Sequence, residues 1–251
     1  ATRVNSQGLI EDMQILSGNL VSNGDFSQEG PELITNGDFA TDSDWTLTQA
    51  TISGGYLNIS TTDGSFSGAR QFVFTVGKTY LVSLEISNIV GTVEVDVNSG
   101  SVYGQTFTTN GSKSFYLKAE NTDIEVKRAF GAEQVISATI DNVSVKEVGQ
   151  DWDFVGEAEL TAQGARVYSS TGSYSSVRQS SDVLTIGNKY KITFNVISTN
   201  GTSLANGNSN ITYDTSTTGN KTFYITASEV GLIFKRAAAI TTDVTITNIS
   251  V

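Results

Sequence analysis

The chain has 251 residues, enough for one large domain or two domains of ordinary size. It contains no Cys and no His, which excludes disulfides, thiolate chemistry and the commonest zinc ligands. The net charge of −11 disfavours nucleic-acid binding, and no apolar run approaches the length that spans a membrane.

The first notable segment in chain order is a short phrase that occurs twice. Residues 1–19 are mainly polar, and only residues 7–18 could hold one or two helical turns. The sequence LVSNGDF follows at residues 20–26 and returns as LITNGDF at residues 33–39, 13 residues later. Asn-Gly favours a turn after the apolar start of a strand, so each copy predicts a first strand. A single domain needs only one first strand, so one of the two copies is not required by the domain that follows them.

Alternation of apolar and polar residues then continues along the chain. Residues 78–87, 91–97, 113–119 and 139–145 alternate with period two and are rich in Val, Ile, Thr, Tyr and Phe. This pattern predicts half-buried strands, separated by short turns of Gly, Asn, Ser and Asp. The expected fold class is all-β.

The second half of the chain repeats the first. TTNGSKSFYLKA at residues 108–119 returns as STTGNKTFYITA at residues 216–227, and IDNVSV at residues 140–145 returns as ITNISV at residues 246–251. Phe115 and Phe223 are 108 residues apart, as are Lys127 and Lys235. A nearly constant offset over several strands predicts two homologous β domains with a boundary near Gly149.

The second repeat lacks a counterpart of LITNGDF. The resemblance given in the next paragraph implies that first and last strands lie side by side, so the last strand of the second repeat would have an open edge. Open apolar edges are usually covered, so we expect residues 19–26 to pair antiparallel with residues 245–251. The first repeat would then be an insertion within the second. The alternatives are donation of this strand to a neighbouring subunit, and a leftover duplication packed against the first repeat. The expected division is an attachment segment (residues 1–19), the spare strand and link (residues 20–32), and two domains (residues 33–149 and 150–251).

The order of these phrases resembles the carbohydrate-binding module 4/9 type over residues 33–251. The resemblance rests on LITNGDFATDSDW, ARQFVFTVGKTYLVSLEI and ISATIDNVSVKEV. It implies two tandem jelly-roll β-sandwich domains behind a short N-terminal attachment segment. Separately, ATRVNSQGLIE at residues 1–11 resembles a segment of tail-fibre-like and head-fibre-like virion proteins of bacteriophages.

Sugar binding requires flat aromatic faces and planar polar groups. Arg-Gln pairs occupy the same position in both repeats, although adjacent strand residues face opposite ways. The alternatives are core packing for the Trp residues and an exposed strand face for the Arg-Gln pairs. Lys127-Arg128 and Lys235-Arg236 are interpreted as an exposed edge that opposes aggregation. The candidate carbohydrate-binding residues are Trp45, Tyr56, Arg70, Gln71 and Tyr103 in the first repeat, and Trp152, Tyr168, Arg178, Gln179 and Tyr213 in the second.

A structural calcium that links first and last strands is implied by the same resemblance. Asp38 and Asp141 occupy those places in the first repeat, whereas the second has Thr247 in place of Asp141. The alternative is that Asn-Gly-Asp simply makes a turn. Acidic residues such as Glu94 and Asp96 do not recur between the repeats and are placed on loops or exposed faces, so catalysis is not expected.

These observations favour a non-catalytic bacteriophage virion protein (tail fibre, head fibre or decoration) that binds a host-surface glycan. Its N-terminal segment would contact other virion proteins at the virion surface, and a trimer is expected by analogy. The alternatives are a polysaccharide-binding accessory module of a secreted, extracellular bacterial enzyme, and spacer domains without a ligand.

Overall fold

The computed structural model describes the chain except residues 1, 5–9, 13–16, 97–103, 132–134 and 208–210. The described residues form strands and turns, and none of them lies in a helix long and apolar enough to cross a membrane. The class is all-β, as expected. In the N-terminal segment, β1 (Thr2–Val4) pairs with β2 (Ile10–Asp12), so the helical alternative for residues 7–18 is wrong at Ile10–Asp12.

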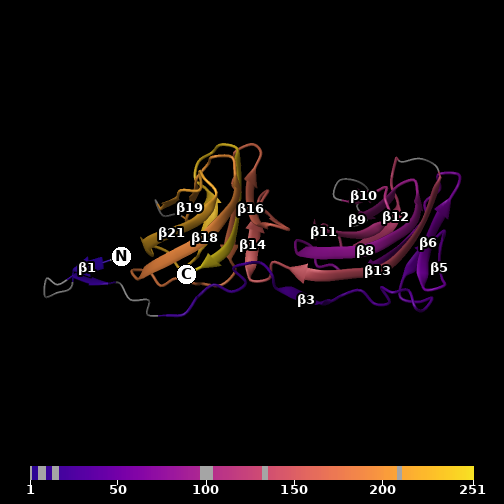
Figure 1. The fold of residues 1–251 in the computed structure, drawn as a ribbon, viewed down its shortest axis with the longest axis horizontal. Helices are drawn as coiled ribbons and strands as arrows, with labels where there is room; N and C mark the ends of the chain where they lie inside the picture. The colour runs from indigo at the N-terminus through magenta and orange to yellow at the C-terminus, as the bar shows by residue number, and fades with distance from the viewer. Residues whose placement is uncertain (1, 5–9, 13–16, 97–103, 132–134, 208–210) are drawn as a thin grey trace.

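Two β-sandwiches stand side by side, each with its own apolar core (Figure 1). Sandwich 1 has a sheet of short strands and a sheet of long strands, and all pairings are antiparallel. The short-strand sheet has the order β10 (Gln105–Phe107), β9 (Val93–Asp96), β12 (Asp123–Arg128), β7 (Gly68–Phe72) and β4 (Thr46–Thr48). The long-strand sheet has the order β11 (Gly111–Lys118), β8 (Thr79–Val90), β13 (Ile136–Val148), β6 (Tyr56–Thr61) and β5 (Ala50–Ser53), with β3 (Glu29–Glu32) paired to the end of β13.

Sandwich 2 repeats this jelly-roll arrangement. Its short-strand sheet has the order β14 (Trp152–Val155), β17 (Ser176–Gln179), β22 (Ile233–Arg236), β19 (Leu204–Ala205) and β20 (Thr212–Tyr213). Its long-strand sheet has the order β15 (Glu159–Thr161), β16 (Gly164–Ser169), β23 (Thr242–Ser250), β18 (Lys189–Thr199) and β21 (Gly219–Thr226).

The two copies of Asn-Gly-Asp-Phe adopt the same backbone conformation. Asn and Phe have positive φ in both, at 47° and 60° for Asn23 and Phe26 and at 54° and 50° for Asn36 and Phe39. Positive φ is uncommon for a bulky residue, so the surroundings must hold each Phe in place. Each Phe packs against a Trp, with ring centroids 5.2 Å apart for Phe26–Trp152 and 5.3 Å apart for Phe39–Trp45.

The hydrogen bonds of the two copies also correspond. In sandwich 1 the amide of Leu33 donates to the carbonyl of Val145, and the amide of Val143 donates to the carbonyl of Gly37. At residues 19–26 the amide of Leu20 donates to Val251 at 3.0 Å, and the amide of Ile249 donates to Gly24 at 2.9 Å.

Residues 19–26 therefore lie antiparallel to the end of β23 in their own chain, and Val21 and Phe26 belong to the core of sandwich 2. The segment is formed of turns rather than a regular strand. These contacts are the ones expected if sandwich 1 is inserted between residues 19–26 and the remainder of sandwich 2, and the division of the chain into four segments stays a prediction.

The sandwiches contact each other where the chain crosses between them. Leu81 and Tyr116 of sandwich 1 pack against the core of sandwich 2, and Val148 at the end of β13 is part of that core. The side-chain amide of Asn23 donates to the carbonyl of Gln150 at 3.2 Å, which joins the two crossing segments. β1 lies on the side of sandwich 2 away from sandwich 1 (Figure 1).

Candidate functional site

A groove of about 380 Å³ lies on the outer face of the short-strand sheet of sandwich 1. Alternation along β7 and β12 turns Ala69, Ile124 and Val126 into the core and Arg70, Glu125 and Lys127 to the outer face. Thr46 and Thr48 on β4 extend this polar floor. Two aromatic side chains also line the groove, Phe66 with 40% exposure and Phe130 with 85% exposure.

Glycine makes room for the floor of the groove. A Cβ at Gly68 would come within 2.6 Å of the Cβ of Lys127, its register partner on β12. A Cβ at Gly104 would lie 2.7 Å from the Cβ of Asp96. Any larger residue at Gly68 or Gly104 would therefore displace Lys127 or Asp96, respectively.

A buried charge network lies in this floor. The Lys127 ammonium donates to Asp96 Oδ2 at 2.8 Å and to Glu125 Oε2 at 3.1 Å, and all three side chains are buried. Burial disfavours the charge on Lys127, but the hydrogen bonds and charges of Asp96 and Glu125 outweigh it and raise the pKa of Lys127. Glu94 accepts a hydrogen bond from the amide of Phe130 at 3.0 Å. Glu94, the register partner of Lys127, thus connects β9 to the backbone of an aromatic residue of the groove.

Of the candidates in sandwich 1, Arg70 lies in the groove and Trp45 and Gln71 do not. Trp45 is buried against Phe39 and donates its indole N–H to the carbonyl of Asn36 at 3.1 Å. Gln71 is buried and bonds both the amide and the carbonyl of Thr35. Both side chains attach residues 35–36 to the sandwich, within a segment (33–39) that was predicted as a strand but lies outside the regular strands. Neither side chain presents a face to a sugar in this structure.

The other two candidates of sandwich 1 are not in the groove. Tyr56 is 43% exposed, but it begins β6 in the long-strand sheet. Tyr103 lies outside the described residues.

In sandwich 2 the buried candidates are Trp152, Gln179 and Tyr213. Trp152 repeats the role of Trp45 and donates to the carbonyl of Asn23 at 3.0 Å. Gln179 donates to the carbonyl of Asp151 at 2.6 Å. Tyr213 is fully buried among Phe194, Phe223 and Phe234, and burial, followed by the charge of Glu229, raises the pKa of its hydroxyl. These side chains are core residues.

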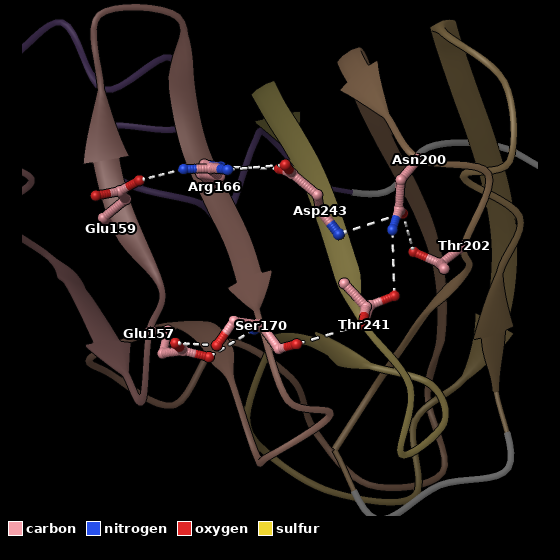
Figure 2. A network of polar contacts seen from close by, with 8 residues as sticks. All are labelled: Glu157, Glu159, Arg166, Ser170, Asn200, Thr202, Thr241 and Asp243. Atoms are coloured by element: carbon pink, nitrogen blue, oxygen red, sulfur yellow. Dashed lines mark hydrogen bonds and ion pairs between the residues drawn. The ribbon is translucent and has the colours of Figure 1, made fainter.

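The remaining two candidates of sandwich 2, Tyr168 and Arg178, already contact charged side chains. The ring of Tyr168 faces the guanidinium of Arg166, which lies 4.1 Å from the ring centroid. Figure 2 shows Arg166 held between Glu159 and Asp243 across three strands, with both Asp243 oxygens accepting, at 2.8 and 2.7 Å. Arg178 is exposed and its Nε donates to Asp153 at 3.0 Å. The structure does not gather these residues into a groove like that of sandwich 1.

The sequence predicted neither that Lys127 lines the groove nor that the carboxylates beside it on β9 are buried. Lys127 was expected on an exposed edge, but it is buried on β12 between β9 and β7, so that interpretation was wrong. Glu94 and Asp96 were expected to be exposed and are also buried. A signal was present in the alternating acidic residues of VEVD and DIEVK, which place charges on one face of two paired strands.

The predicted calcium ligands each make a local hydrogen bond. Asp38 accepts from the amide of Ala40 at 3.3 Å, and Asp141 accepts from the amide of Asn142 at 2.7 Å. Within the described part of the chain, no three acidic, His or Cys side chains converge to hold a metal ion. The local bonds match the turn interpretation, and the calcium at Asp38 and Asp141 stays a prediction.

No protein-family model matches this chain, and no curated protein matches it either. Three solved structures are similar to it over part or most of its length. One is titled "CBM4 structure and function" (15% identity, 50% of this chain and 98% of that chain, TM-score 0.29). The second is the tandem CBM22-1–CBM22-2 domain from Paenibacillus barcinonensis Xyn10C (12% identity, 89% and 98%, TM-score 0.28). The third is TmCBM61 in complex with β-1,4-galactotriose (15% identity, 51% and 98%, TM-score 0.25).

Proposed function

We propose that the chain is a non-catalytic glycan-binding protein, and that the groove on sandwich 1 holds the saccharide. The observation that carries this proposal is the pairing of exposed aromatic rings with a polar floor in one groove, at Phe66, Phe130, Arg70 and Glu125. Aromatic faces suit the apolar face of a pyranose, and charged planar groups suit its hydroxyls. The resemblance of residues 33–251 to carbohydrate-binding modules supports the same class of ligand.

Arg70 is the residue best placed to recognise the sugar. Its guanidinium lies 5.5 Å from the ring centroid of Phe72, and among the described residues it makes no ion pair. Its counterpart Arg178 is paired with Asp153, since sandwich 2 has an acidic residue where sandwich 1 has Thr46. The free donors of Arg70 are therefore available to hydroxyl groups of a ligand.

The test is a glycan array with the full chain, followed by affinity measurement on the best ligand for three variants. Arg70→Ala and Phe130→Ala should each weaken binding about tenfold or more, a loss of roughly 1.4 kcal/mol. The matched control Arg178→Ala should bind like the wild type. Binding unchanged by the first two variants, or lost with Arg178→Ala, contradicts the assignment to this groove, and an array without any signal contradicts glycan binding.

The biological setting is a second part of the proposal. The resemblance of residues 1–11 to phage fibre proteins favours host attachment by a virion, with the N-terminal segment contacting other virion proteins. The alternative setting is a secreted bacterial enzyme that uses these domains to hold polysaccharide. Antibodies against the chain that label phage particles would support the first, and labelling confined to the culture medium of a bacterium would support the second.

A further inference from the structure

The short-strand sheet of sandwich 1 contains all the buried charged side chains of the described residues. Three of them form one cluster on its outer face, Lys127, Asp96 and Glu125, whose side chains are 7%, 3% and 8% exposed. Removing charges from water is costly, and their mutual attraction offsets that cost only in part. Conversion of two of these charges into a neutral group would therefore remove an unfavourable contribution.

The amine of Lys127 is in contact with both carboxylates. Its Nζ lies 2.8 Å from Oδ2 of Asp96 and 3.1 Å from Oε2 of Glu125. Asp96 is opposite Glu125 across β9 and β12, and Lys127 is the next residue on the same face of β12. Reacting groups held at roughly 3–3.5 Å behave as if they were highly concentrated. The two paired strands thus hold an amine and a carboxyl group in position to react.

The two carboxylates differ in their surroundings. Oδ1 of Asp96 is buried and has no hydrogen-bond partner, so the charge of Asp96 is stabilised at one oxygen only. Glu125 instead lines the groove on the outer face of the sheet. Asp96 is therefore the carboxyl group that more readily accepts a proton and becomes an electrophile, and Glu125 is the one that stays ionised.

We propose that Lys127 and Asp96 condense into an isopeptide bond, with Glu125 as the proton carrier. Nζ of Lys127 forms a bond with Cγ of Asp96, and the bond between Cγ and Oδ2 breaks. Two protons of the ammonium leave with that oxygen as water, one directly to Asp96 and one through Glu125. The remaining N–H of the new amide donates to Glu125. No other reactant is needed, and the bond is independent of glycan binding because both reactants belong to the chain.

The condensation should be slow. Burial lowers the pKa of Lys127, but the hydrogen bonds and charges of Asp96 and Glu125 raise it overall, so the neutral amine is a minor form. Proton transfer along the short hydrogen bond to Asp96 produces that form within the site. The reaction therefore requires the folded sandwich and time, but no external base.

Sandwich 2 provides an internal comparison. The lysine equivalent to Lys127 is Lys235, which has Ala205 as its register partner on β19. Ile233 occupies the position equivalent to Glu125, two residues before Lys235 on β22. These positions hold no carboxylate, so Lys235 should not react.

The experiment measures the intact mass of the full chain, incubated in the folded state at neutral pH and then denatured. The wild type should be lighter than its sequence by one water molecule. Trypsin cleaves after Lys and Arg, so it should release residues 79–113 joined to residues 119–128, because the modified Lys127 resists cleavage. The bond closes a loop across 31 residues, and the linked chain should unfold roughly 10 °C above Lys127→Arg.

Three variants locate the reaction. Lys127→Arg keeps the positive charge but cannot form the bond, so it should have the full mass of its sequence. Glu125→Gln keeps both reacting groups and should remain at its full mass over the same incubation. The matched control Lys235→Arg should still lose one water molecule.

Four results would count against the proposal. A wild type that keeps the full mass of its sequence excludes the bond. So does a loss of water that survives in Lys127→Arg. A linked product without residues 79–113 would assign the bond to Glu125 instead of Asp96. Reaction of Glu125→Gln at the wild-type rate would exclude Glu125 as the proton carrier.

Discussion

The two sandwiches share a backbone plan and differ in the chemistry of one sheet face. The register that pairs Glu94 with Lys127 in sandwich 1 pairs Ala205 with Lys235 in sandwich 2. Likewise Glu125 pairs with Arg70, whereas Ile233 pairs with Arg178. The lysine and the arginine recur, and the carboxylates do not. Repetition therefore accounts for the shared sheets, whereas among the described residues the buried carboxylates beside the groove occur in sandwich 1.

In the long-strand sheets it is sandwich 2, rather than sandwich 1, that has the charge network. Sandwich 2 has the Arg166–Asp243 pair across β16 and β23, with Glu159 as a second partner (Figure 2). At the corresponding pair of positions in sandwich 1, β6 and β13 hold Asn58 and Ser137. Each sandwich thus carries its strongest charge network on a different sheet.

The largest effect is expected for Phe26→Ala, which tests whether residues 19–26 belong to sandwich 2. The chain has one Trp in each sandwich, so Trp45→Phe leaves Trp152 to report on sandwich 2, and Trp152→Phe leaves Trp45 to report on sandwich 1. Phe26→Ala removes a buried ring and should lower the unfolding free energy of sandwich 2 by about 3–5 kcal/mol. Urea denaturation followed by Trp152 fluorescence measures this loss.

Phe39→Ala is the matched control and should produce the same loss in sandwich 1. The insertion model would be falsified if Phe26→Ala weakened sandwich 1 instead. A loss that depended on protein concentration would favour exchange of the segment between subunits.

A second prediction contrasts the two equivalent lysines. Lys127→Met leaves Asp96 and Glu125 buried without their cation and should destabilise sandwich 1 by roughly 3–5 kcal/mol. Lys235 is only half-buried, and no ion pair with it occurs in the described structure, so Lys235→Met should change sandwich 2 by less than about 1 kcal/mol. Denaturation in the two single-Trp backgrounds gives both values, and equal effects would remove the distinction between the two faces.

The smallest effect concerns acid stability. Hydrogen bonds from Arg166 lower the pKa of Asp243 below its ordinary value of 3.8. A lowered folded-state pKa stabilises the native state above the unfolded value, and this contribution is lost as the pH falls through the folded value. Because Arg166 and Asp243 are partly exposed, the contribution should be about 1 kcal/mol.

Asp243→Asn should therefore weaken sandwich 2 at pH 7 and reduce the loss of its stability as the pH falls below about 4. The stability of sandwich 1 should not respond to this substitution, because Asp243 lies on β23 of sandwich 2. An unaltered acid profile of the variant would show that the Arg166–Asp243 pair contributes nothing measurable.

Strand positions and the repeat were readable from the sequence because alternation and turn residues act locally. The strand expected at residues 78–87 is β8 (Thr79–Val90), and that at 139–145 lies within β13 (Ile136–Val148). The sequence also predicted that residues 19–26 complete the second repeat. That repeat has no counterpart of LITNGDF, and the spare copy LVSNGDF stands at residues 20–26. The hydrogen bonds of Leu20 and Ile249 agree with that prediction.

The site was only partly readable, because alternation assigns a residue to a face and does not say what lies on that face. Arg70 was proposed from its recurrence and lines the groove, whereas Trp45 and Trp152 were proposed for sugar binding although Phe39 and Phe26 pack against them in the cores. Lys127 looked like an edge charge, because its partner Asp96 lies on another strand, 31 residues earlier. Burial of a polar side chain depends on strands distant in sequence, so it emerged only when those strands were assembled into one sheet.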